Sequence, residues 1–565
     1  MDFIENIAAY LSARTGLAKE EIKQIVEVPP NPSMGDYAFP CFRLSKPLRK
    51  APNAIACALE EDTQKPQGIA KMCAQGPYLN FFVDRALFIE NILTRVRAQK
   101  DRFGSSDEGK GRAVCIDYSS INIAKPFHVG HLSTTVIGAS LARIYDFLGY
   151  RSVSINHLGD WGTQFGKLIV AYKRWGDQER IEADSVDELL KIYVRFHEEA
   201  EKEPALDDEA RAWFKKIEEG DGEALALMQW FRELTLKEAH VIYDLLNIRF
   251  DSYAGESFYN DKMQPVLDEL EQKGLLCDSD GAKMVDLSAY DMPPCLILKS
   301  DGATLYATRD IAAAFYRKKT YDFYKNLYVV AYQQNLHFRQ WFKVIELMGY
   351  DWASQLEHVA FGMVSMEEGT LSTRKGKVVL LKDVLNQAVE KSFAIMEEKN
   401  PELADKQTVA QQVGVGAVVF DVLSNNRIKD IVFSFSRVLN FDGETGPYVQ
   451  YSHARCCSVL EKGAGICLDQ ADLRALDDEE AFAVARLLYS FEDAVREACR
   501  KNEPSVITRH VVDIAQAFNK YYYEHRILIE GDEQGSAARL MLTDAVRQTI
   551  RNGLMLLNIA SPAKM

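Results

Sequence analysis

The sequence predicts an α/β protein that ends in a helical region. Between about residues 113 and 385, short apolar runs alternate with stretches of helical periodicity, the pattern of a parallel sheet with crossover helices. From about residue 440 onward, strand patterns fade and helical spacing dominates. One such repeat runs through Arg539, Leu540, Leu542, Val546, Ile550, Leu554 and Leu557. The length of 565 residues is too great for one core and indicates roughly three to four domains.

The first segment, residues 1–103, is predicted to be a separate small domain. Residues 4–11 have helical character, and residues 29–37 form a loop rich in proline. Residues 78–83 have the character of a strand. By pattern alone, this loop and strand indicate nothing more than a turn and a core strand. A linker rich in glycine, serine and charge, residues 104–112, then leads into the α/β region.

A strand that turns into a helix is the most informative feature of the α/β region. Residues 114–118 form an apolar run typical of a buried strand, and residues 137–148 carry one apolar helical stripe. His128, Gly130 and His131 lie at the turn between them. Unpaired N–H groups and the positive end of a helix dipole favour an anion at such a place. Two histidines could equally be a helix cap and a core side chain.

The rest of the α/β region, residues 104–385, contains two further features. A probable strand at residues 152–155 leads into a glycine-rich block at residues 156–166. Ligands of open α/β sheets lie beyond the carboxyl ends of strands, so we expect this block to line the site. His157 and Gln164 are its polar candidates, although tight turns explain the block equally well. At about residues 180–245, a stretch dense in Glu, Lys and Ala predicts a helical insertion.

Composition limits the class of protein. Hydrophobic content of 47% and charged content of 26% are ordinary for a soluble globular protein. We find neither an apolar run of about 18 residues nor a secretion signal, so we expect a cytoplasmic protein without membrane contact. The ten cysteines include no Cys-x-x-Cys pair, which predicts reduced thiols and no metal site of that kind. The net charge of −15 argues against a general nucleic-acid coat but not against a local basic face.

The turn between strand and helix belongs to a longer motif. Residues 119–131 read SSINIAKPFHVGH, which resembles the first signature of class I aminoacyl-tRNA synthetases in the form used by bacterial-type arginyl-tRNA synthetases. The resemblance implies a Rossmann-like catalytic domain that converts ATP and an amino acid to an aminoacyl-adenylate. It assigns ATP contacts to His128, Gly130 and His131. Lys125, His128 and His131 are the expected catalytic residues, with Lys125 acting on the phosphates as a point charge.

The second signature of the class, a lysine-rich loop, is degenerate in this chain. Residues 370–377 read TLSTRKGK, with Thr370 and Thr373 where the signature has lysine. The preceding block at residues 358–364, HVAFGMV, also resembles the family. In such enzymes Lys125 is thought to replace the lost charge. As a pattern alone, the loop could be a solvated basic turn. The resemblance assigns further ATP contacts to Gly362, Met363, Ser372 and Lys375.

Specificity for arginine requires a pocket of acceptors. A guanidinium has five N–H donors in a planar fork and a permanent charge, so it needs carboxylates and neutral acceptors around it. By resemblance, Tyr306 and Asp310, four residues apart and on one helix face, hold the guanidinium side. Asn122 and Gln334 hold the backbone end, while Asp117 could contact either end. Taken singly, each carboxylate is more simply a surface charge.

The helical C-terminal region resembles the family's anticodon-binding domain. We expect residues 386–440 to be a connecting helical region that contacts the tRNA stem, and residues 441–565 to bind the anticodon. Aromatic side chains can stack on splayed RNA bases, although Tyr451 could equally pack in the core. The resemblance also implies that residues 1–103 contact the tRNA elbow. The expected anticodon-side contacts are Tyr448, Gln450, Tyr451 and Arg455.

The resemblance extends over nearly the whole chain and implies arginine–tRNA ligase activity. The expected fold is a Rossmann-like catalytic domain with a helical insertion, an N-terminal α+β domain and an all-α C-terminal domain. ATP, Mg²⁺, L-arginine and tRNA(Arg) are the expected cofactors and partners of a monomer. Two positions depart from the family pattern: this chain has Ile121 where proline is usual and Ser133 where arginine is usual.

Two other hypotheses agree less well with the sequence. An RNA-binding paralogue without catalysis would not need to retain the lysine and histidines of the first signature. A class I synthetase for another amino acid fits less well, because Asp117 and Asp310 suit a cationic substrate and would repel an acidic one.

Overall fold

The chain forms two compact units in its computed structural model, which describes residues 2–299, 306–366 and 379–565. The first unit consists of Met1–Phe103, Cys456–Ser490 and Asp513–Thr549. The second consists of Gly104–Arg455, Phe491–Val512 and Ile550–Met565. The helical C-terminal region is therefore shared between the two units. All ten cysteines are free thiols.

The N-terminal part of the first unit is an α+β fold. Its sheet has the order β1-β3-β2, and both pairings are antiparallel. The predicted helix at residues 4–11 and the predicted strand at residues 78–83 are confirmed as α1 and β3. The bounds are α1 Phe3–Thr15, α2 Lys19–Ile25, β1 Tyr37–Pro40, α3 Ser45–Leu48, α4 Pro52–Glu60, β2 Ile69–Gln75, β3 Tyr78–Val83 and α5 Arg85–Gln99.

The C-terminal region is helical, as the sequence predicts, and after Phe433 the described chain has no strand. Within the first unit, α5 packs against α18, where the Phe88 ring lies 5.5 Å from that of Phe482. Arg85 pairs with Glu479 at 2.7 Å across the same helices. The bounds are α17 Gly446–Lys462, α18 Glu479–Tyr489, α19 Phe491–Lys501, α20 Ser505–Glu524 and α21 Glu533–Leu556.

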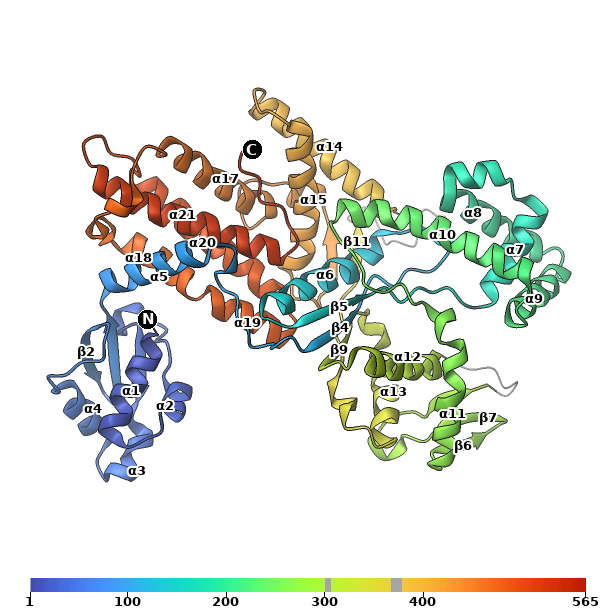
Figure 1. The fold of residues 1–565 in the computed structure, drawn as a ribbon, viewed down its shortest axis with the longest axis horizontal. Coiled ribbons are helices and arrows are strands. Elements are labelled where there is room, and N and C mark those ends of the chain that lie inside the picture. Colours follow the sequence, from blue (N-terminus) through green and yellow to red (C-terminus); the bar gives the residue numbers. More distant parts are fainter. Residues whose placement is uncertain (1, 300–305, 367–378) are drawn as a thin grey trace. The chain divides into compact units, whose positions relative to one another are not determined.

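A four-stranded parallel sheet lies at the centre of the second unit (Figure 1). Its order is β10-β9-β4-β5, so the predicted strand after the linker, β4, is internal. All five residues of β4 are buried, as expected for a strand covered on both faces. The bounds are β4 Ala113–Asp117, β5 Arg151–Ile155, β9 Lys325–Tyr328 and β10 Leu356–His358.

Helices pack closely on this sheet. Cys115 and Ile155 share one buried cluster with Trp341 of α13 (Asn335–Leu347) and with residues of α12 (Tyr306–Tyr321). The predicted helix after the signature is α6 (Leu132–Phe147). Its Gly138 lies directly against Tyr118, because a Cβ there would come within 2.2 Å of the tyrosine ring. The close approach therefore requires glycine at this position.

The helical insertion predicted at about residues 180–245 is confirmed. Two small sheets were not predicted: the antiparallel β6-β7-β8 and the parallel pair β11-β12. Their strands are three or four residues long, and β6 has no fully buried residue, so no alternation marks it. The bounds are α7 Thr163–Trp175, α8 Gln178–Ala200, α9 Ala205–Glu218, α10 Gly222–Leu245, α11 Met263–Gln272, β6 Leu276–Ser279, β7 Ala282–Val285, β8 Cys295–Leu298, β11 Val364–Met366 and β12 Ile431–Phe433.

The region that follows the α/β part is mainly helical. It contains α14 (Leu381–Lys399), α15 (Lys406–Ser424) and α16 (Phe435–Val438). Residues 385 and 386, between which the sequence divides two segments, both lie within α14. Across the described ranges, we find no helix with the length and apolar character needed to cross a membrane.

Candidate active site

Four of the predicted motifs leave the parallel sheet at the same edge. Residues 118–131 follow β4, residues 156–166 follow β5, residues 329–337 follow β9, and residues 359–363 follow β10. The carboxyl ends of parallel strands meet at one edge, which is where open α/β sheets bind ligands. Short bridges join neighbouring motifs, Asn122 to Gly159 and Ala331 to Phe361. Motifs that lie far apart in the sequence thus form one surface.

The first signature is held in an unusual backbone conformation. Ser119 and Ala124 have φ values of 60° and 57°, a region that costs a non-glycine residue roughly 1–2 kcal/mol. Side chains from two helices stabilise these positions. The Ser119 N–H donates to Thr134 Oγ1 of α6 at 3.0 Å, and the Ala124 N–H donates to Thr235 Oγ1 of α10 at 3.0 Å. The loop before the histidines is therefore fixed in shape.

The two signature histidines lie side by side and are uncharged at neutral pH. Their ring centroids are 4.0 Å apart. His128 Nδ1 accepts the Gly130 N–H at 3.1 Å, so the proton of the neutral ring lies on Nε2. Burial, together with nearby Lys125, lowers the pKa of His128, and burial lowers the pKa of His131 to about 3. Both rings can therefore donate or accept hydrogen bonds without carrying charge.

Lys125 is exposed and lies between the strained backbone and the histidines. The degenerate second signature, including Ser372 and Lys375, lies outside the described residues. The segment after it is bonded to the first signature: the Val129 N–H donates to Val379 O at 3.0 Å, and the Leu381 N–H donates to Phe127 O at 2.9 Å. Main-chain hydrogen bonds therefore hold the segment that begins at Val379 against the first signature.

The block before the second signature turns tightly against residues 427–430, which precede β12. Gly362 is buried, and a Cβ there would lie 2.3 Å from Lys429 O. Its N–H donates to Arg427 O at 2.7 Å. The Met363 N–H donates to Asp430 Oδ1 at 2.7 Å, while the Met363 side chain is exposed. Of the two, Met363 is the residue whose side chain can meet a ligand.

Asp117, predicted for the arginine pocket, already has partners within the chain. Its Oδ2 accepts from Arg317 Nη2 at 2.7 Å, and its Oδ1 accepts from Ser120 Oγ at 2.9 Å. Both side chains of the ion pair are almost completely buried. Burial by itself would lower the pKa of Arg317, but Asp117 raises it well above the usual value. The negative charge of Asp117 is thus balanced by Arg317 inside the protein.

Tyr306 is the first residue of α12, and Asp310 lies one turn later on the same helix face, as their spacing of four predicts. Asp310 Oδ2 lies 2.6 Å from His337 Nε2, and each of these two side chains is 27% exposed. No other hydrogen bond to the Asp310 carboxylate occurs among the described residues. Tyr306 is largely exposed. Asp310 is therefore an accessible carboxylate with acceptor capacity left over.

Glu256 contributes a second acidic group near Asp310. It lies 3.4 Å from Arg309 Nη1, and burial raises its pKa to about 7, against the opposing effect of Arg309. Glu256, Arg317 and His337 were not among the residues predicted for the site. His337 follows Gln334 inside a recognised family block, and that block was the available signal. The other two show no sequence pattern of their own.

The glycine-rich block explains the position of Asn122. A Cβ on Gly159 would come within 2.1 Å of Asn122 Oδ1, so glycine permits this approach. Asn122 is exposed, as is Gln334. His157 is more enclosed: its Nδ1 has no partner in the described chain, and burial lowers its pKa against the effect of Asp117. Gln164 bonds to Trp161 O at 3.4 Å, in keeping with a turn.

The two departures from the family pattern are both buried. Ile121 packs as an apolar side chain. Ser133 lies in the first turn of α6, and its Oγ has no hydrogen-bond partner in the described parts of the chain. Neither residue presents a side chain to solvent.

The residues predicted to contact RNA differ in exposure. Tyr451 is 42% exposed, and the Arg455 guanidinium lies 4.9 Å from its ring centroid. Tyr448 is half-buried. Gln450 is fully buried, and its Nε2 donates to Gln412 O at 3.1 Å and to Ala560 O at 2.8 Å. In this structure the Gln450 side chain therefore holds the C-terminal segment, and it is not exposed to a ligand.

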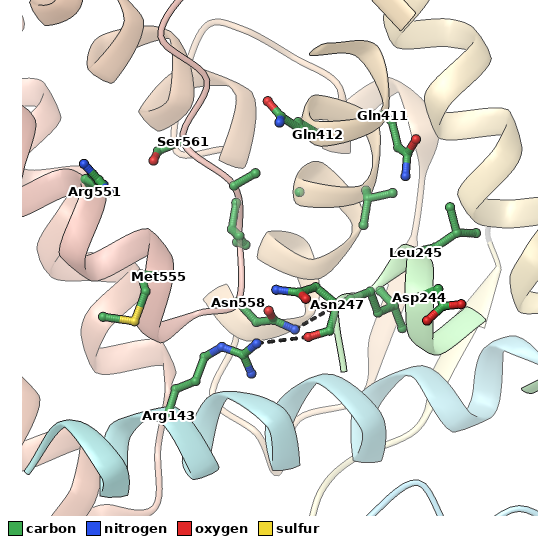
Figure 2. A pocket seen from close by; sticks show the side chains of 15 residues that line it. Arg143, Asp244, Leu245, Asn247, Gln411, Gln412, Arg551, Met555, Asn558 and Ser561 are labelled. Carbon is green, nitrogen blue, oxygen red and sulfur yellow. Dashed lines mark hydrogen bonds between the residues drawn. The ribbon is translucent and has the colours of Figure 1, made fainter. Parts of the chain in front are cut away.

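A separate cavity of about 430 Å³ lies in the second unit (Figure 2). Arg143 of α6 extends across its base and donates to Asn247 O at 3.0 Å. Asn558 donates to Leu246 O at 2.6 Å, which ties the C-terminal segment to the end of α10. None of the predicted site residues that the structure describes lines this cavity. Four segments that lie far apart in the sequence line this cavity, and none of them is a motif at the carboxyl edge of the sheet.

Comparisons with known proteins agree over the whole chain. Family models match at residues 1–83 ("Arginyl tRNA synthetase N terminal domain"), 91–435 ("tRNA synthetases class I (R), catalytic domain") and 449–565 ("DALR anticodon binding domain"). An arginine–tRNA ligase of Clostridioides difficile is 56% identical over 549 residues, covering 97% of each chain. One of Alkaliphilus metalliredigens is 55% identical over 565 residues, covering 100% of each.

A solved structure supports the same conclusion. The arginyl-tRNA synthetase of Thermus thermophilus superposes with a TM-score of 0.81 at 27% identity, covering 99% of each chain. The chain therefore belongs to the class I arginyl-tRNA synthetases, and its activity is that of an arginine–tRNA ligase.

Proposed function

We propose that arginine is activated at the carboxyl edge of the parallel sheet, by the residues that the sequence singled out there. The observation that supports this most is the convergence of four motifs at one edge, with bridges between their neighbours. In the reaction, the arginine carboxylate attacks the α-phosphorus of ATP and pyrophosphate leaves. The protein must orient two anions and stabilise charge on phosphate oxygens.

Lys125, His128 and His131 act on ATP. The two histidines are neutral, so they serve as hydrogen-bond partners for phosphate or ribose oxygens rather than as cations. The positive charge at this place then comes from Lys125 and from the start of α6. Gly130 keeps the turn open beside the phosphates, and Met363 contacts the nucleotide next to Gly362. Ser372 and Lys375 add contacts from the second signature.

The arginine pocket selects its substrate by charge balance. Asp117 is neutralised by Arg317, so it orients Ser120 and the signature instead of binding the substrate charge directly. Asp310 keeps acceptor capacity, and it binds the guanidinium together with Tyr306. Asn122 and Gln334 hold the α-amino and α-carboxylate end. One cationic side chain is thus paired with one carboxylate, which favours arginine over neutral and acidic amino acids.

Mg²⁺ enters with ATP as part of the substrate. Among the described residues, one group of three side chains could hold a metal ion, Asp478, Glu480 and His525, and it belongs to the first unit, away from the signature in the sequence. Mg²⁺ commonly binds through phosphates and water with few protein ligands. We therefore assign no residue of this chain as a resident metal ligand.

The remaining parts of the chain bind tRNA(Arg). Tyr451, whose ring is exposed, and Arg455, which lies over that ring, form a stacking pair suited to an unpaired base, and the half-buried Tyr448 contacts the RNA from the same helix. Residues 1–103 contact the tRNA elbow, residues 104–385 carry the chemistry, residues 386–440 contact the stem, and residues 441–565 bind the anticodon. The protein works as a cytoplasmic monomer.

ATP–pyrophosphate exchange tests this assignment. Exchange is measured with each amino acid separately, with and without tRNA(Arg). We expect exchange with arginine in the presence of its tRNA and none with other amino acids. Exchange with another amino acid, or none under any condition, would contradict the proposal.

A further inference from the structure

We propose that His337 is a positioning residue that makes the site selective for arginine, by holding the Asp310 carboxylate in the orientation that a guanidinium requires. This inference rests on the proposed role of Asp310. His337 lies in the first turn of α13 (Asn335–Leu347), and Asp310 lies in α12 (Tyr306–Tyr321). The contact therefore bridges two helices that pack on the sheet.

The geometry is that of a short, charge-assisted hydrogen bond. His337 Nε2 lies 2.6 Å from Asp310 Oδ2. With a proton on Nε2, the imidazole donates to this carboxylate oxygen. It also leaves Oδ1 and one lone pair of Oδ2 available. A guanidinium, with its planar fork of donors, can then bind the same carboxylate at its remaining positions.

The backbone that carries His337 is fixed by buried neighbours. Phe338, the next residue, is buried and stacks on His358 with ring centroids 4.2 Å apart. Trp341, four residues after His337, is fully buried in the core against the sheet. His337 itself remains 27% exposed, so its ring lies at the edge of the core and faces the pocket carboxylate. A rigid support of this kind lowers the entropy cost of binding, because Asp310 is already oriented.

Solvent would not hold the Asp310 carboxylate in one orientation as His337 does. Without the imidazole, the Asp310 side chain would rotate and bond to solvent or to neighbouring groups. The preceding residue, Arg309, pairs with Glu256 through Nη1 and Oε2 at 3.4 Å. Among the described residues, no hydrogen bond or ion pair joins Arg309 to Asp310. His337 is thus the side chain whose removal frees the carboxylate while leaving its charge unchanged.

The test compares His337→Ala with His337→Gln in ATP–pyrophosphate exchange with arginine, ATP and tRNA(Arg). A Gln amide N–H occupies nearly the position of Nε2–H and restores the donor. We expect His337→Ala to raise the arginine KM about 10- to 100-fold, as for loss of a hydrogen bond to a charged group, with the ATP KM within about threefold of wild type. His337→Gln should recover most of the loss. His240→Ala, which removes an exposed histidine bonded to Tyr253 OH at 3.0 Å, is the matched control and should change neither constant.

A double-mutant cycle with Asp310→Asn separates this role from a merely structural one. If His337 acts through Asp310, adding His337→Ala to Asp310→Asn should change the arginine KM less than about threefold. An unchanged arginine KM in His337→Ala, or full additivity in the double variant, would overturn the inference. An unchanged arginine KM in Asp310→Asn would instead overturn the proposed pocket, so the two failures can be told apart.

Discussion

Replacing Asp310 with asparagine tests the charge balance of the arginine pocket most directly. The change keeps the shape of the side chain and one oxygen acceptor but removes the negative charge. The carboxylate is 27% exposed, so solvent screens part of its interaction with a guanidinium. A hydrogen bond between charged groups contributes about 2–3 kcal/mol under these conditions, which corresponds to a rise of roughly 30- to 150-fold in the arginine KM.

The assay is ATP–pyrophosphate exchange with tRNA(Arg) present, measured with arginine and with citrulline, its neutral analogue. The variant should lose discrimination between the two substrates, because only arginine depends on the carboxylate charge. Asp322→Asn, at a carboxylate just after the same helix whose side chain is 92% exposed, is the matched control and should behave as wild type. An arginine KM within about threefold of wild type, with discrimination retained, would refute the reasoning.

Two further variants probe the ATP side and the buried ion pair. Lys125→Ala should abolish exchange while arginine binding, followed by calorimetry, is retained; normal turnover would show that this charge is not needed. Arg317→Met should destabilise the protein by about 3–5 kcal/mol, seen as a lower thermal midpoint, because it leaves Asp117 buried without its partner. Adding Asp117→Asn should restore much of that stability, and a double variant as unstable as the single one would contradict the account.

Much of the fold could be predicted from local sequence patterns. Strand β4 and helix α6 follow from an apolar run and a helical stripe, and each is buried as its pattern requires. The insertion helices α8 to α10 follow from composition in the same way. The sheet β6-β7-β8 could not be predicted, because its strands are short and partly exposed. Patterns of this kind report burial, so an element that buries little leaves no signal.

The sequence by itself determined the family and the reaction, and it predicted the residues that meet the substrates. It could do so because the signatures are contiguous, and a motif such as residues 119–131 carries its chemistry within one short stretch. It also indicated that Asp117 and Asp310 belong to one pocket. It could not say that these two carboxylates have different partners.

Only the tertiary structure decided how the charges of the pocket are paired. Arg317 lies 200 residues from Asp117 in the sequence, and His337 lies 27 residues from Asp310, yet each pair is within hydrogen-bond distance. Such pairings depend on how helices pack across the sheet. Burial likewise decided that His131 is neutral and that Gln450 is a packing residue. Solvent access and long-range contacts are properties of the folded chain, and no local pattern records them.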